Sequence, residues 1–93
     1  MNIAIVGATG LVGVELKKIL EKKKIKKILF VASKKSEGKT IEYNNKKHKV
    51  ISIKKALTEK INYAIFSAGS DVSKKYAERF IKKGAVVIDN SSF

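Results

Sequence analysis

A chain of 93 residues forms one domain with a modest core, and its lack of cysteine excludes disulfides, thiolate metal sites and thiol nucleophiles. No apolar run reaches the roughly 18 residues of a membrane span and no signal segment precedes the first strand, so we expect a cytoplasmic protein that binds no membrane. Lys and Arg number 21 against 8 Asp and Glu, a net charge of +13. Every cation except Arg79 is a lysine and the lysines are scattered, which favours solvated helix faces over a specific nucleic-acid site.

Strand and helix patterns alternate from the first residues. The apolar, β-branched run Asn2–Val6 is typical of a parallel strand buried on both faces. Apolar residues at helical spacing between Val12 and Leu20 predict a helix, and residues 27–32 predict a second strand. The first third of the chain is therefore predicted to form a βαβ unit.

The rest of the chain continues this alternation after a polar loop at residues 33–39. Further strands are predicted at residues 40–43, 47–53, 63–67 and 85–89, and helices at residues 54–60 and 71–83. We expect the first two of these strands to form a hairpin or meander on the sheet edge, separated by Asn44-Asn45-Lys46, where the two asparagines tolerate positive φ. Gly84 is expected to end the last helix. The predicted fold is α/β: one domain, 1–93, with a Rossmann-like open, mostly parallel twisted sheet and flanking helices.

Three glycines at three-residue spacing, Gly7, Gly10 and Gly13, follow the first strand and precede the first helix. In this context Gly7 permits a tight turn, Gly10 lets the backbone approach a pyrophosphate, and Gly13 allows close helix–strand packing. The helix N-terminus then faces the anion. The pattern predicts nucleotide binding, and it is not a Walker A loop because no Gly-Lys-Ser/Thr closes it.

The end of the second predicted strand indicates which nucleotide. An NAD site places Asp or Glu there to hold the ribose hydroxyls, whereas this chain has Ser33, Lys34, Lys35 and Ser36. Cations and hydroxyls suit a 2′-phosphate that a carboxylate would repel, so the sequence predicts NADP.

Small polar residues follow two later strands, as Ser67-Ala68-Gly69-Ser70 and Asp89-Asn90-Ser91-Ser92. The carboxyl ends of parallel strands are where open α/β sheets bind ligands, so these residues are candidates for lining the cofactor site. Alternatively, Ser70 or Asp71 caps the helix that follows. His48 stands alone among lysines and is expected to be a solvated surface residue. No metal site or catalytic residue is predicted.

Four segments together resemble the N-terminal part of aspartate-semialdehyde dehydrogenase. They are IAIVGATGLVGVEL at 3–16, VASKKSEGK at 31–39, YAIFSAGSDVSKKYA at 63–77 and GAVVIDNSSF at 84–93. The alternatives are the cofactor domain of an N-acetyl-glutamyl-phosphate reductase, an atypical short-chain reductase, and a stand-alone nucleotide- or polyanion-binding module. A short-chain reductase would need a Tyr-x-x-x-Lys pair after a later strand. Phe80 stands four residues after Tyr76 in place of that lysine, which counts against this alternative.

The resemblance implies an NADP-binding domain whose glycine loop carries the pyrophosphate. It also implies that Lys35 and Ser36 stand where the family uses an Arg-Ser pair for the 2′-phosphate. The expected cofactor-binding residues are Gly7, Thr9, Gly10, Leu11, Val12, Gly13, Ser33, Lys35, Ser36, Ser67, Ala68, Gly69, Asn90 and Ser91.

The family reduces aspartyl phosphate to aspartate semialdehyde, in amino-acid biosynthesis, through a cysteine thioester that a chain without cysteine cannot form. We therefore expect a truncated chain, inactive alone, that meets the small-molecule substrate only together with a catalytic and dimerisation domain. Full-length relatives are expected to be homo-oligomers.

Overall fold

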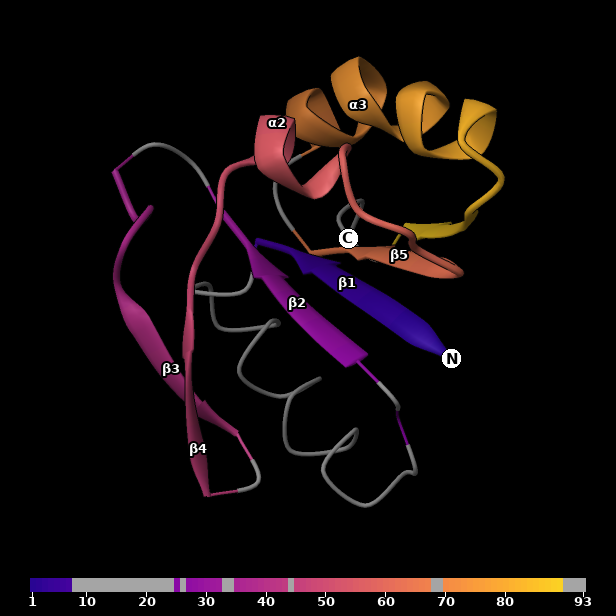
Figure 1. Ribbon diagram of the computed structural model, residues 1–93. Coiled ribbons are helices and arrows are strands. Elements are labelled where there is room, and N and C mark those ends of the chain that lie inside the picture. Colours follow the sequence, from indigo (N-terminus) through magenta and orange to yellow (C-terminus); the bar gives the residue numbers. More distant parts are fainter. Residues whose placement is uncertain (8–24, 26, 33–34, 44, 68–69, 90–93) are drawn as a thin grey trace.

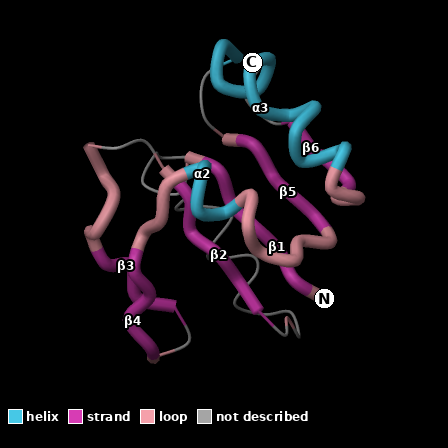
Figure 2. The backbone as a smooth tube through the Cα atoms, turned by 45° about the horizontal axis from the view of Figure 1, so that its top comes forward, coloured by secondary structure: helices cyan, strands magenta, loops and turns pink. Residues whose placement is uncertain are grey.

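Four parallel strands form the main sheet (Figure 1). The computed structural model describes residues 1–7, 25, 27–32, 35–43, 45–67 and 70–89. The strands are β1 (Asn2–Val6), β2 (Lys27–Val31), β5 (Tyr63–Phe66) and β6 (Val86–Asp89), in the order β2-β1-β5-β6. Each neighbouring pair is parallel. Figure 2 shows the same strands side by side from a second angle. The predicted open α/β sheet is confirmed, and the helix expected at 12–20 lies outside the described residues.

Strand β1 lies at the centre of the core. Its residues Ala4 and Ile5 have no exposed surface and Val6 is 1% exposed. Because side chains alternate along a strand, Ala4 and Val6 pack into one hydrophobic cluster while Ile5 packs into another on the opposite face. A strand buried on both faces needs a continuous apolar run, which is what the sequence supplies.

Helices α2 (Ile53–Ala56) and α3 (Ser70–Lys82) cover one face of the sheet (Figure 1). Phe80 of α3 is fully buried and meets Phe66 of β5 edge to face, with ring centroids 5.6 Å apart. After α3 the chain reverses at Gly84, which has a φ of 93° and donates its N–H to Ile81 O at 2.9 Å. The predicted role of Gly84 as the helix-ending residue is confirmed.

The hairpin of β3 (Thr40–Tyr43) and β4 (Lys46–Lys49) differs from its predicted position. It forms a separate two-stranded antiparallel sheet instead of extending the edge of the main one, although Asn45 has the expected positive φ of 63°. The strand predicted at 47–53 is also shorter: after β4, Ile51 makes an isolated bridge to Val31, and Ser52 begins α2. The reason is local, because the Ser52 hydroxyl accepts a hydrogen bond from Lys55 N and so caps a helix.

The expectation that His48 is a solvated surface residue is wrong. Its ring is half-buried and packs edge-on against Phe30, with centroids 5.5 Å apart, and against Tyr43, at 5.9 Å. His48 pairs with Ile41 across the hairpin, which places it on the same face as Tyr43. That face packs toward β2.

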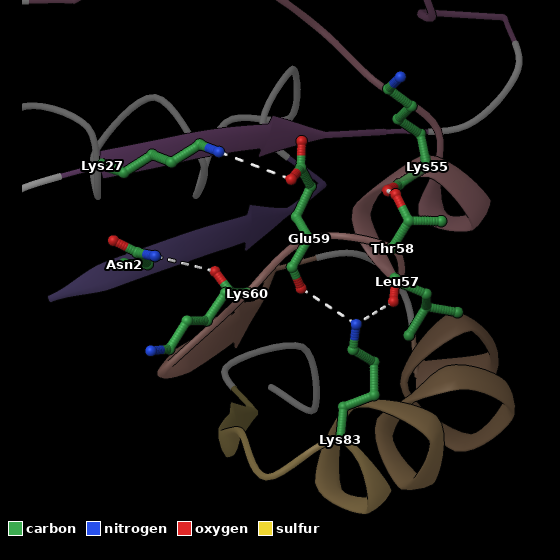
Figure 3. A network of polar contacts seen from close by, with 8 residues as sticks. All are labelled: Asn2, Lys27, Lys55, Leu57, Thr58, Glu59, Lys60 and Lys83. Carbon is green, nitrogen blue, oxygen red and sulfur yellow. Dashed lines mark hydrogen bonds and ion pairs between the residues drawn. The ribbon is translucent and has the colours of Figure 1, made fainter.

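Polar contacts hold the chain together at the end of the sheet where its strands begin (Figure 3). The Asn2 side chain donates to Lys60 O at 3.1 Å, just before β5. The Lys83 ammonium, just after α3, donates to the carbonyls of Leu57 and Glu59, the latter at 3.0 Å. These contacts fasten the segment between α2 and β5 to β1 and to the end of α3.

We expect Lys83→Met to lower the free energy of unfolding by about 1 kcal/mol, because charge-assisted hydrogen bonds to two carbonyls are lost. Thermal unfolding should shift down by roughly 4–8 °C for a domain of this size. Lys82→Met is the matched control, since it removes the same charge from the same helix end. Equal shifts for the two variants would show that the carbonyl contacts contribute nothing.

Candidate functional site

The direction in which successive strands are added to the main sheet reverses at β1. From β1 the chain first adds β2 on one side and later adds β5 on the other. Val6 lies opposite Val31 of β2 and opposite Phe66 of β5, so the three strands end together. In open α/β sheets, the crevice at such a reversal, outside the carboxyl ends of the strands, is the usual ligand site.

Gly7 turns the chain out of the sheet at this point. Its φ is 91°, a conformation that glycine adopts readily and other residues do not. Its N–H donates to Val31 O at 2.7 Å, so the turn is fastened to the end of β2. The other predicted residues of the glycine loop, Thr9, Gly10, Leu11, Val12 and Gly13, lie outside the described residues.

Ser67 meets the same turn from the other side. Its N–H donates to Val6 O at 2.8 Å, and its half-buried hydroxyl lies 3.0 Å from Val6 O and 3.2 Å from Gly7 O. The structure thus brings together two predicted site residues, Gly7 and Ser67, that lie 60 positions apart in the chain.

Lys35 and Ser36 begin a short turn beyond the end of β2. The turn closes with a hydrogen bond from Lys39 N to Ser36 O at 3.1 Å, and Lys35 is exposed while Ser36 is half-buried. Two more backbone bonds fasten it to the segment after the hairpin: Gly38 N donates to Val50 O at 2.9 Å, and Val50 N donates to Lys39 O at 2.7 Å. Lys35 is therefore an exposed cation on an anchored loop.

Sequence reasoning did not assign Gly38 and Val50 to the site. Gly38 has a φ of 89°, and Val50 is 1% exposed in the cluster on the hairpin side. The available signals were a glycine within a polar loop and a single valine after a run of lysines. Neither signal reveals that the two residues pair with each other.

The remaining predicted site residues, Ser33, Ala68, Gly69, Asn90 and Ser91, also lie outside the described residues. The elements next to them run to the same edge of the sheet, since Asp89 at the end of β6 lies opposite Phe66 and α3 begins at Ser70. At the end of β2, none of the described residues from Val31 to Ser36 is acidic.

Metal-binding clusters and membrane-spanning helices are both absent from the part of the chain that the structure describes. It holds no group of three or more His, Asp or Glu residues able to bind a metal ion. None of its helices has the length and apolar character needed to cross a membrane.

The sequence profile described as "Semialdehyde dehydrogenase, NAD binding domain" matches residues 2–93. The chain belongs to the semialdehyde dehydrogenase family. Together, the fold, the convergence of Gly7 and Ser67 at the strand reversal, and this match make it the nucleotide-binding domain of that family.

Similar proteins bear out the resemblance that the motifs indicated. The aspartate-semialdehyde dehydrogenases of Aquifex aeolicus and Campylobacter jejuni are 44% and 48% identical to the chain, and each match covers 98% of it. A crystal structure of aspartate semialdehyde dehydrogenase II from Vibrio cholerae superposes with a TM-score of 0.90 at 37% identity, covering 98% of this chain and 30% of that one. The chain spans 28% of the length of the two curated relatives.

We expect Gly38→Ala to destabilise the Lys35 turn by about 1 kcal/mol, because an L side chain is strained at this φ. No atom lies within 4 Å of the position that a Cβ would take, so the cost is backbone strain and not a clash. Chemical denaturation measures the loss. Gly38→Asn is the matched control, since asparagine tolerates positive φ better, and it should recover part of the stability. A loss as large in the asparagine variant as in the alanine variant would contradict this explanation.

Proposed function

We propose that the chain binds NADP(H) as the cofactor portion of an aspartate-semialdehyde dehydrogenase, which reductively dephosphorylates aspartyl phosphate to aspartate semialdehyde. The observation that carries the proposal is the convergence, at one edge of the sheet, of the Gly7 turn, Ser67 and the anchored Lys35 loop. The relatives are named aspartate-semialdehyde dehydrogenases, and the reaction is the one that the resemblance to this family implies.

The cofactor fits the groups that lie at this edge. The glycine turn at the end of β1 would let the backbone approach a pyrophosphate, and α3 begins at the same edge with the positive end of its dipole. Thr9, Gly10, Leu11 and Val12 would hold the pyrophosphate, and Gly13 would let the helix that follows pack closely against the sheet. Ala68, Gly69, Asn90 and Ser91 would line the rest of the site. The nicotinamide of a bound cofactor would supply the hydride, and these residues would hold the cofactor in place.

Selectivity for the 2′-phosphate is assigned to Lys35, with Ser33 and Ser36. The exposed Lys35 offers a positive charge in the turn that follows β2, and the described residues between the end of β2 and Lys35 include no carboxylate, although Glu37 is exposed in the same turn. A lysine is a point charge without the bidentate fork of arginine, so it favours NADP less strictly. Use of NAD as a second cofactor is compatible with this arrangement.

The catalytic cysteine and the dimerisation surface of the enzyme are assigned to polypeptide other than these 93 residues, which contain no cysteine. Strand β6 supports this division. Val86 and Ile88 on one face of β6 are 54% and 43% exposed, an unusual state for neighbouring apolar side chains in a parallel strand. We propose that the catalytic portion covers this face and that the complete enzyme is a homo-oligomer.

Lys35→Glu should weaken NADPH binding at least about tenfold, because a favourable charge pair becomes a repulsive one. The affinity for NADH, which has no 2′-phosphate, should change by less than about threefold. Isothermal titration calorimetry with both cofactors measures the two affinities. Lys47→Glu on β4 is the control, as it makes the same charge change on an exposed residue outside the loop. Equal losses for NADPH and NADH would place Lys35 away from the 2′-phosphate.

The net charge of +13 keeps a polyanion-binding module as the competing function. Titration of NADPH and of duplex DNA at low and high salt separates the two. We expect saturable NADPH binding at both salt concentrations, and DNA binding that disappears at high salt because it rests on counterion release. Tight DNA binding at high salt without NADPH binding would contradict the proposed function.

A further inference from the structure

The Ser67 hydroxyl is engaged with the protein backbone in a way that limits what else it can do. It lies 3.0 Å from Val6 O and 3.2 Å from Gly7 O, and both carbonyls are acceptors only. A serine hydroxyl has a single proton, so this proton is shared between two backbone carbonyls. In this arrangement the proton is directed at the protein backbone and not at a ligand.

The two carbonyl oxygens differ in the other hydrogen bonds that they accept. Val6 O already accepts a ladder bond from Ser67 N at 2.8 Å. Gly7 O lies beyond the last residue of β1. Within the described part of the chain, it accepts a hydrogen bond from the Ser67 hydroxyl. The side chain thus reaches one residue past the strand and binds the carbonyl of the turn itself.

Gly7 is consequently fixed from two sides. Its N–H is bonded to Val31 O on β2 and its carbonyl to Ser67 after β5. Glycine has more conformational freedom than any other residue, so sterics alone do not select its φ of 91°. Because a peptide unit is planar, fixing the carbonyl fixes the direction in which the chain leaves Gly7. Ordering the turn before the ligand arrives removes an entropy cost from binding.

We propose that Ser67 is a positioning residue for the nucleotide: its hydroxyl acts through the Gly7 carbonyl, holding the turn in the orientation that receives the pyrophosphate. This role of Ser67 rests on the proposed nucleotide binding. In this role, Ser67 donates its hydrogen bond to the Gly7 carbonyl and not to the cofactor. Removal of the hydroxyl should therefore affect ligands that carry a pyrophosphate more than ligands that reach only the Lys35 loop.

The test compares two ligands on the 93-residue chain. Calorimetry gives the dissociation constants of NADPH and of adenosine 2′-monophosphate, which has the 2′-phosphate but no pyrophosphate. We expect Ser67→Ala to weaken the binding of NADPH about tenfold, the usual effect of one lost hydrogen bond. The dissociation constant of adenosine 2′-monophosphate should change by less than about twofold. Thr58→Ala is the matched control, because the Thr58 hydroxyl also donates to a backbone carbonyl, Lys55 O at 2.6 Å. This variant should leave the affinity for both ligands unchanged.

Unchanged NADPH affinity in Ser67→Ala, or equal weakening of both ligands, would overturn the proposal. Ser67→Cys, nearly isosteric but a weaker donor, gives the same comparison if the alanine variant does not fold, and its loss should be intermediate. Amide hydrogen exchange at Gly7 measures the turn without any ligand, and it should be faster in Ser67→Ala than in the wild type. Unchanged exchange overturns the positioning role. Failure of the wild type to bind NADPH instead removes the proposed function, so the two failures are distinguishable.

Discussion

The burial of β1 on both faces, with a parallel partner on each edge, is the constraint from which the rest of the structure follows. Ala4 and Ile5, at opposite faces, are completely buried, so each side of the sheet must be covered. Phe80 of α3 covers one cluster, and Tyr43 and Val50 from the hairpin region cover the other. Because the chain must also reach both edges of β1, the strand order reverses there, and the reversal creates the place where a ligand can bind.

The two ends of the sheet are held together by different kinds of bond. At the amino-terminal end, side chains such as Asn2 and Lys83 donate to loop carbonyls. At the carboxyl end, the bonds at Gly7 and Ser67 are made largely by the backbone, with one hydroxyl in addition. Most bonds at the carboxyl end are therefore independent of side-chain identity, and the Ser67 hydroxyl is the exception among them.

The sequence predicted what depends on local pattern and missed what depends on distant pairing. Apolar runs located β1, β2, β5 and β6, and the conformations of Asn45 and Gly84 follow from their own chemistry. The inward position of His48 depends on its pairing with Ile41 and on the presence of Phe30, which no local pattern contains. Likewise, the sequence indicated Ser67 as a site residue, but its bonds to carbonyls 60 and 61 positions away appear only in the fold.

A continuous path of backbone hydrogen bonds connects the glycine turn to the Lys35 loop. Gly7 N binds Val31 O, Ala32 N binds Ile51 O, and the adjacent Val50 binds both Gly38 and Lys39. No side chain takes part in these bonds, so the separation between the proposed pyrophosphate and 2′-phosphate positions is set by the backbone. A side chain at position 35 can then change from arginine to lysine, as the resemblance implies, without moving the turn. Cofactor selectivity and cofactor positioning are therefore separable properties of this domain.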